Sequence, residues 1–387
     1  LYQQSGGGGQ PPPLMGLAIN RALEQLCYEL LDSYRFYRPV EPQVMAESHQ
    51  LYRLARQYGV LNTRTGEDDG GNPSFSTAAL YHTSMLLSLT DPFRLAEGEV
   101  GLLYDILIRY ADSCRIIPGN SWSGSGDGLF FIDLHTTAPP VPCTRLTPPV
   151  DAREPYLLDA TQALAAIRER LAQTPAKVRM QSPEAMVLRR LLPDVSGAER
   201  RREQRHADGR GVMLLSGLEN IHAWLLHAAG TAPGTTRPPE PAPCKVLDAS
   251  DSGMKLEWEE GGPGDARVGD LLGIVEDEGE QQSLRLALIR SIRVFHEGGL
   301  EAGVQLMHGS LGAVSCSVPD EPDSAAHALF LPASETGQST ATLITAKGLY
   351  TEGRQLLVDV GGREIRVRCG RRVFDSPVVD RFEFFAE

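Results

Sequence analysis

The hydrophobic pattern of this 387-residue chain changes its period once, near Gly211, and this change limits the fold more than any other feature. Before that point apolar residues recur every three or four positions, as on the buried face of a helix. After it, short runs alternate apolar and polar residues between Gly, Asp and Pro, as in half-buried strands. A chain of this length normally folds as two or three domains. We therefore expect a multidomain α+β protein, with helices first and β domains after them.

The first part of the chain is predicted to be a mainly helical domain over residues 14–195, after a Gly- and Pro-rich flexible tail at 1–13. One β excursion is expected near 128–146, where Leu129–Leu134 is an apolar run typical of a strand. The segments with helical periodicity are Leu14–Tyr37, Gln43–Tyr58, Ser76–Leu87, Glu97–Tyr110, Pro155–Gln173 and Pro183–Leu192.

The second part of the chain predicts two β domains. Several short strands at close spacing favour a small antiparallel barrel or sandwich within 196–318. A third, small β domain is expected at 319–387, where Gly353 and Gly361 mark turns. The strand candidates of the middle domain are Lys245–Asp248, Met254–Trp258, Leu271–Val275, Ser283–Phe295 and Leu300–Met307.

The overall charge and the cysteines exclude several classes of function. A formal net charge of −13 argues against general binding to nucleic-acid polymers or anionic membranes, so any anion site must be a local cluster of positive charge. Six scattered cysteines without a CxxC fit neither a zinc site nor a disulfide framework. No apolar run reaches about 18 residues, and the beginning does not resemble a signal peptide. We expect a cytoplasmic protein without membrane insertion, metal or cofactor.

The densest positive charge is the arginine run within Glu199–Arg205. Arginine has a planar fork that pairs with phosphate oxygens and a flat face that stacks on bases, so the run suits a ligand with phosphates and purines. The other interpretation is an exposed helix start, since Ser196–Glu199 has a capping-box pattern.

The turn Asp248–Gly253 lies between two strand candidates. Asp248 and Ser250 can cap the turn or hydrogen-bond the edge of a base, and Gly253 permits a backbone conformation that is closed to other residues. An ordinary hairpin turn, which needs no ligand, has the same composition.

Taken together, the two elements resemble the PilZ family, the bacterial cyclic di-GMP receptor barrels. The family's RxxxR motif is matched by Arg201 and Arg205, and its [D/N]xSxxG motif by Asp248, Ser250 and Gly253. Both motifs occur in the family's order. The segments Val268–Leu272, Leu288–Val294 and Leu300–Leu306 downstream look like the family's later strands. The resemblance covers roughly residues 199–316.

The resemblance implies a receptor and not an enzyme. By carry-over, Arg201 and Arg205 would grip the phosphates of cyclic di-GMP and stack on guanine. Asp248 and Ser250 would hydrogen-bond a guanine edge or the nearby backbone, and Gly253 would hold the turn. The arginine segment would close over the ligand and relay its level to a protein partner through the helical domain. The outputs implied are motility, pili, biofilm or exopolysaccharide control.

The sequence departs from the family between the two motifs, where the separation from Arg205 to Asp248 is nearly twice the usual one. The excess is interpreted as an insertion at 217–243, a helix followed by a Pro- and Gly-rich linker. Leu218, Ile221, Trp224 and Leu225 share one face of this helix. It is expected to act as a lid or a docking surface, or to mark a site that has degenerated.

Two rival functions remain open. A scaffold or adaptor would keep the barrel and lose the ligand. An enzyme would have its active site in the helical domain near Ser121–His135. The Gly-rich loop Gly124–Gly128 precedes a strand and is not followed by Lys-Ser/Thr, so it is not a P-loop. No HExxH or GxSxG motif is present, and no catalytic residue is assigned.

Overall fold

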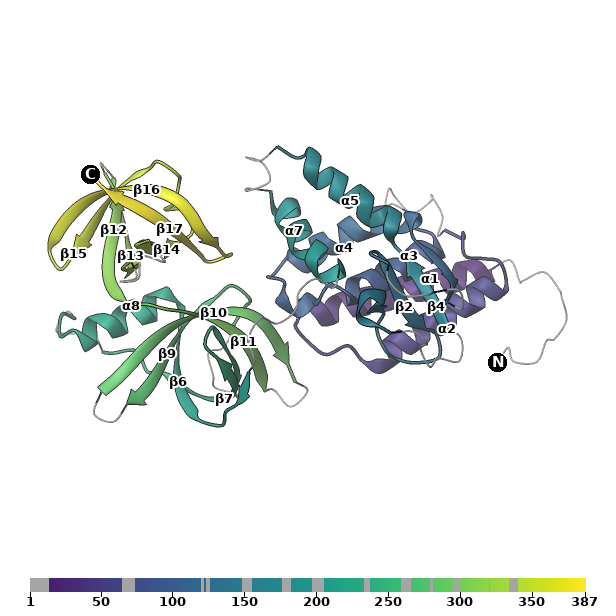
Figure 1. The fold of residues 1–387 in the computed structure, drawn as a ribbon, viewed down its shortest axis with the longest axis horizontal. Coiled ribbons are helices and arrows are strands. Elements are labelled where there is room, and N and C mark those ends of the chain that lie inside the picture. The colour runs from purple at the N-terminus through teal and green to yellow at the C-terminus, as the bar shows by residue number, and fades with distance from the viewer. Residues whose placement is uncertain are drawn as a thin grey trace. The chain divides into compact units, whose positions relative to one another are not determined.

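A computed structural model of the chain divides into two compact units, Leu1–Arg201 and Arg202–Glu387, whose folds are drawn in Figure 1. The structure describes residues 14–64, 74–119, 122, 126–147, 155–175, 182–196, 205–232, 237–258, 266–278, 281–295, 299–319, 321–333 and 340–387. The tail expected at 1–13 lies outside the described residues.

The first unit is mainly helical, as expected. Its helices are α1 (Met15–Arg35), α2 (Pro42–Gln57), α3 (Thr77–Ser88), α4 (Glu99–Tyr110), α5 (Thr161–Gln173) and α7 (Pro183–Ser196), with short 3-10 turns at Pro92–Arg94, Ala111–Ser113 and Cys143–Arg145. Helix α3 is central, because it is buried on nearly every side and α1, α2 and α4 pack against it. Its first turn is capped by Ser76, whose hydroxyl accepts the N–H of Ala79 at 3.0 Å. None of the described helices is long and apolar enough to cross a membrane.

A four-stranded antiparallel sheet interrupts these helices in the order β1–β4–β2–β3. Its strands are β1 (Arg115–Pro118), β2 (Leu129–Asp133), β3 (Val141–Pro142) and β4 (Pro155–Asp159). Strand β2 matches the expected β excursion. The prediction of a helix from Pro155 is wrong over β4, because this segment pairs with both β1 and β2 and buries Leu157 and Leu158. Helix α5 begins only after Asp159, whose carboxylate accepts the N–H of Thr161 at 3.0 Å.

The second unit begins with the expected antiparallel barrel, called here the middle barrel. Its strands are β5 (His206–Ala207), β6 (Gly211–Ser216), β7 (Ala242–Ser250), β8 (Gly253–Trp258), β9 (Leu271–Glu278), β10 (Gln281–Val294) and β11 (Leu300–Met307). Six strands follow one another in the order β7–β6–β9–β10–β11–β8, and pairing between β7 and β8 closes the ring. The short strand β5 pairs with β7 beyond the end of β6.

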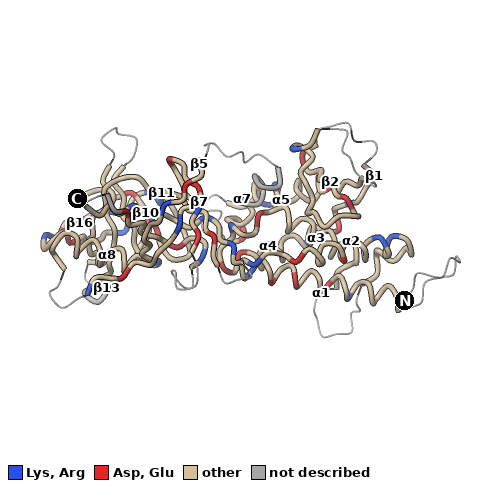
Figure 2. The backbone as a smooth tube through the Cα atoms, turned by 90° about the horizontal axis from the view of Figure 1, so that it is seen from below, with Lys and Arg blue, Asp and Glu red and all other residues tan. Residues whose placement is uncertain are grey.

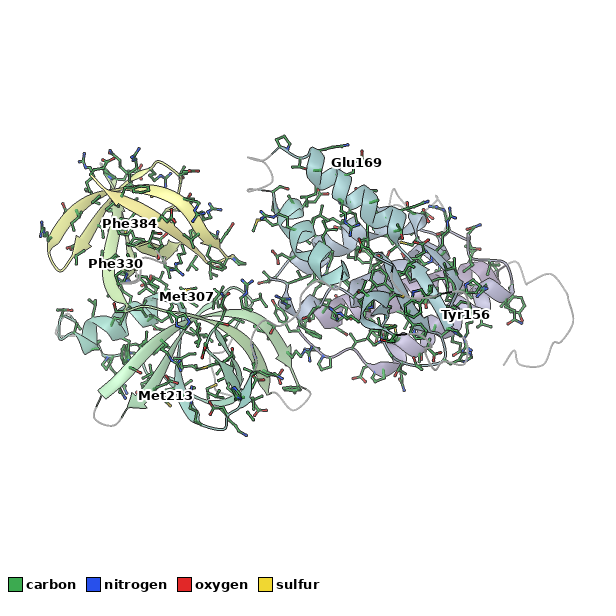
Figure 3. All side chains as sticks on the ribbon, in the orientation of Figure 1. Tyr156, Glu169, Met213, Met307, Phe330 and Phe384 are labelled. Atoms are coloured by element: carbon green, nitrogen blue, oxygen red, sulfur yellow. The ribbon has the colours of Figure 1, made fainter. Side chains whose placement is uncertain are left out.

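A second closed barrel follows in the order β12–β13–β14–β17–β16–β15. Its strands are β12 (Gly312–Val318), β13 (Glu321–Leu331), β14 (Thr342–Ala346), β15 (Gln355–Val360), β16 (Arg363–Asp375) and β17 (Val379–Ala386). Phe382 is fully buried in it, and Phe330 and Phe384, labelled in Figure 3, meet edge to face at 6.0 Å. Strand β12 pairs with β13 and β15, so the boundary expected at 318 moves to the segment before β12.

Helix α8 (Gly217–Ala228) joins the two barrels. It is inserted between β6 and β7, packs on β6 and β9 of the middle barrel, and contacts β12 and β13 of the second barrel (Figure 1). Its buried residues Leu218 and Ile221 belong to one apolar cluster with Leu271 of the middle barrel and Leu329 of the second. Met213 and Met307, labelled in Figure 3, pack against the same cluster. The two barrels and α8 therefore share a hydrophobic core.

Candidate ligand-binding site

The hairpin of β7 and β8 carries the second motif on the outer face of the middle barrel. Met254 of β8 is buried inside the barrel, as is Val246 of β7. The register between the two strands shifts between Val246 and Asp248, which places one extra residue in β7. Residues two apart share a face of a strand, so Asp248 and Ser250 would point inward with Val246 if this β-bulge were absent. Because of the bulge they face outward.

The motif's serine and glycine end the hairpin. Ser250 and Gly253 face each other across the turn, and the Ser250 hydroxyl donates a hydrogen bond to the Gly253 carbonyl oxygen at 3.3 Å. The expectation that Gly253 provides an unusual backbone conformation is wrong, since its φ is not positive. A side chain is excluded for another reason: an added Cβ would lie 2.7 Å from the carbonyl oxygen of Val304 on β11. Glycine is needed here for close approach of two strands.

Arg205 meets Asp248 across β5 and β7. Its Nη1 lies 2.6 Å from Oδ1 of Asp248, and each side chain is about one-quarter exposed (25% and 26%). Strand β5 positions the arginine, because His206 pairs with Ala249 and Ala207 with Asp248. Two residues that are 43 positions apart in the sequence therefore form a direct, charge-assisted hydrogen bond.

Two charged residues that sequence reasoning missed continue this arrangement. Lys255 of β8 is the cross-strand partner of Asp248, and its Nζ lies 2.7 Å from Oε1 of Glu301 on β11. Four residues alternate in sign from the position before β5 across β7, β8 and β11, and are here called the charge row: Arg205, Asp248, Lys255 and Glu301. Figure 2 marks acidic and basic positions of the chain around β5 and β7. The sequence shows that polar residues alternate with apolar ones in β8 and β11. It does not show which residues of the two strands face each other.

The charge row can bind an anion only if its internal pairs rearrange. Its four charges sum to zero, because each of its two cations pairs with a carboxylate of the row. A phosphate could recruit the guanidinium of Arg205 because that group has five donors, of which the contact with Asp248 uses one. The first arginine of the RxxxR motif, Arg201, lies outside the described residues.

Helix α8 is not placed to cover this hairpin. In the ring of six strands, β9 has the neighbours β6 and β10, whereas β8 has the neighbours β7 and β11. The strands β8 and β9 are therefore on opposite sides of the barrel, and α8 packs on the side of β9. The expectation of a lid over the site is wrong for α8, whose apolar face is already occupied by the two barrels.

In the region proposed for a rival enzyme site, His135 contacts neighbouring polar side chains. The Asp133 carboxylate accepts the N–H of His135 at 3.0 Å, and the His135 ring lies 3.2 Å from Arg53. Ser121 lies outside the described residues. Among the residues that the structure does describe, no group of three or more His, Cys, Asp or Glu could hold a metal ion.

Comparisons with known proteins agree with this division of the chain. Three family models match in order: the N-terminal domain of cyclic-di-GMP receptor FimW at residues 1–119, its middle PilZ domain at 231–310, and its C-terminal β-barrel domain at 316–386. The chain is also 22% identical to a protein of Pseudomonas aeruginosa named cyclic-di-GMP receptor FimW, over 96% of this chain and 72% of that protein.

The middle match covers β7 to β11, and with them the hairpin that carries Asp248, Ser250 and Gly253. The last match covers the second barrel from Cys316 onward. None of the three models describes an enzyme. The three matches follow the order of that receptor's domains, and the match to its middle PilZ domain lies on the closed middle barrel.

Proposed function

We propose that this protein is a receptor for cyclic di-GMP, which binds on the outer face of the middle barrel beside the hairpin of β7 and β8. The observation that carries the proposal is the meeting of Arg205 and Asp248, one residue from each family motif, at 2.6 Å. The matches to domains of a receptor with that name support the choice of ligand.

Each site residue has a role in this proposal. Arg201 and Arg205 grip the phosphates and stack on guanine, which uses both the fork and the flat face of the guanidinium. Asp248 and Ser250 hydrogen-bond a guanine edge or the nearby backbone. Gly253 holds the turn and lets β8 approach β11 closely.

The receptor acts in the cytoplasm and without turnover of the ligand. The level of cyclic di-GMP is relayed to a protein partner through the helical unit. The partner belongs to the control of motility, pili, biofilm or exopolysaccharide.

Isothermal calorimetry with cyclic di-GMP at fixed ionic strength tests the proposal. We expect binding by the wild type and a loss of at least about tenfold in affinity for Arg205→Ala, because the variant loses a charge-assisted phosphate contact. Arg210→Ala is the matched control. Arg210 pairs with Glu276 (3.1 Å) and Asp208 (3.4 Å) outside the charge row, so its loss should leave affinity unchanged.

The rival functions predict other results. Absence of binding heat for the folded wild type would establish the scaffold that lost its ligand. Unchanged affinity of Arg205→Ala would place the ligand elsewhere. An enzyme with its site near His135 would convert cyclic di-GMP or another substrate at a rate that Arg205→Ala does not alter.

A further inference from the structure

The charge row poses a problem for any anionic ligand. Asp248 is held by Arg205 and is only 26% exposed. If Arg205 turns its donors toward a phosphate, the Asp248 carboxylate loses its partner beside a second anion. A partly buried carboxylate without a compensating cation is costly, and the repulsion from the phosphate adds to that cost.

Lys255 is the cation placed to solve this problem. It faces Asp248 directly across β7 and β8, and such cross-strand pairs have Cβ atoms about 4.5–5.5 Å apart. The ammonium group is on a flexible four-carbon stem and is 35% exposed, so it can change partner without repacking of the barrel. Its present partner is Glu301, whose side chain is 15% exposed.

We propose that Lys255 is a positioning residue of the site: it neutralises Asp248 when Arg205 engages the ligand, and Glu301 restrains it in the ligand-free protein. This inference rests on the proposed function, since it concerns the same ligand. It assigns opposite effects to two residues that form one ion pair. Removing the lysine weakens binding, whereas removing the charge of its present partner strengthens it.

Calorimetry with cyclic di-GMP on three full-length variants tests this assignment. Lys255→Met should bind about tenfold more weakly, because Asp248 is then left uncompensated, and Glu301→Gln about threefold more tightly, because Lys255 is released. Lys245→Met is the control: this exposed lysine of β7 faces Glu257, and its loss changes the net charge equally. The control should bind like the wild type.

A purely structural ion pair predicts a different result. If Lys255 and Glu301 only stabilise the barrel, both variants lower the melting temperature and neither raises affinity. Weaker binding by Glu301→Gln, or unchanged binding by Lys255→Met, overturns the proposal. Absence of binding by the wild type, or unchanged binding by Arg205→Ala, counts against the proposed function itself, so failure of this inference is distinguishable from failure of the proposed function.

A double variant tests whether Lys255 acts through Asp248. In an Asp248→Asn background Lys255 has no carboxylate at position 248 to neutralise, so the further change Lys255→Met should alter affinity by less than about twofold. A tenfold loss in that background would mean that Lys255 contacts the ligand directly, which overturns the proposed route through Asp248.

Discussion

The two outer faces of the middle barrel differ in composition and in what covers them. On the side of β9, the outward residues Leu271 and Val275 are buried beneath α8 and the second barrel. On the opposite side, the outward residues of β8 include Lys255 and Glu257, which are partly exposed. The first face contributes to the stability of the unit, and the second carries the charge row.

The order of apolar and polar residues in the strands shows this difference between the two faces. Strand β9 begins with an uninterrupted apolar run, Leu271–Val275, which an antiparallel strand needs only when both of its faces are covered. Strand β8 alternates apolar and polar residues, as expected for a strand with one face in water. A continuous apolar run in a small antiparallel barrel therefore marks the face on which another element packs.

The largest expected effect is a loss of stability from a substitution on the face of the middle barrel that α8 covers. Ile221→Ala removes a fully buried side chain from the cluster shared by α8 and both barrels, and should lower the free energy of unfolding by about 2–5 kcal/mol. Denaturant titration measures the loss. Calorimetry on the variant that remains folded should give the wild-type affinity for cyclic di-GMP. A parallel loss of affinity would show that the two faces are not independent.

A smaller loss of stability is expected from a substitution at Gly253, on the face that carries the charge row. Gly253→Ala places a Cβ against the backbone carbonyl of Val304 and should cost about 1–3 kcal/mol, because two paired strands must separate. Gly303→Ala is the matched control, since its Cβ meets the Ser291 hydroxyl, which can rotate away. Equal melting temperatures for the two variants would contradict the close approach of β8 and β11.

Acidification should also act on the covered face. His222 of α8 is buried, lies 3.1 Å from the Val314 carbonyl oxygen and stacks on His327 at 4.1 Å between ring centroids. Burial, and secondarily the charge of His327, lowers the pKa of His222. Glu219, which pairs with His327, opposes this shift.

The sign of the pH effect follows from that shift. The unfolded chain has the higher histidine pKa, about 6.5, and so binds the proton first as the pH falls. The stability from neutral His222 is therefore fully present above that value and decreases below it. His222→Gln should flatten the dependence of melting temperature on pH between about 7 and 5, whereas His308→Gln, at an exposed histidine of the same unit, should not. Parallel curves for all three proteins would contradict this prediction.

The smallest expected effect is the coupling between the faces. Arg205→Ala should cost about 1 kcal/mol of stability or less, because the pair with Asp248 is partly solvated. Combined with Ile221→Ala, the two losses should add to within about 0.5 kcal/mol, since the residues lie on opposite sides of the barrel. A larger coupling energy in this double-mutant cycle would mean that the site and the shared core communicate.

Much of the fold was predictable because its signals are local. Helical spacing identified α1 to α4, and the alternation of Leu300–Met307 matches β11 in full. Strand β4 was missed because its pairing with β1 and β2 comes from segments distant in the sequence. The boundary before β12 was misplaced for the same reason, since only pairing with β13 and β15 assigns that strand to the second barrel.

Prediction of the site from the sequence has the same limit, because strand register is not a local signal. The motif residues Arg205, Asp248, Ser250 and Gly253 were selected by type and order, and the structure brings the first two together. Their outward orientation depends on the β-bulge before Asp248, which spacing alone does not reveal. Lys255 was invisible as a site residue, because its relation to Asp248 and Glu301 is a matter of strand register.

The β-bulge before Asp248 has a consequence for how sequences of this kind can be compared. One residue more or fewer in β7 would move Asp248 and Ser250 to the other face of the strand, so a chain can keep both motifs unchanged and still lose the site.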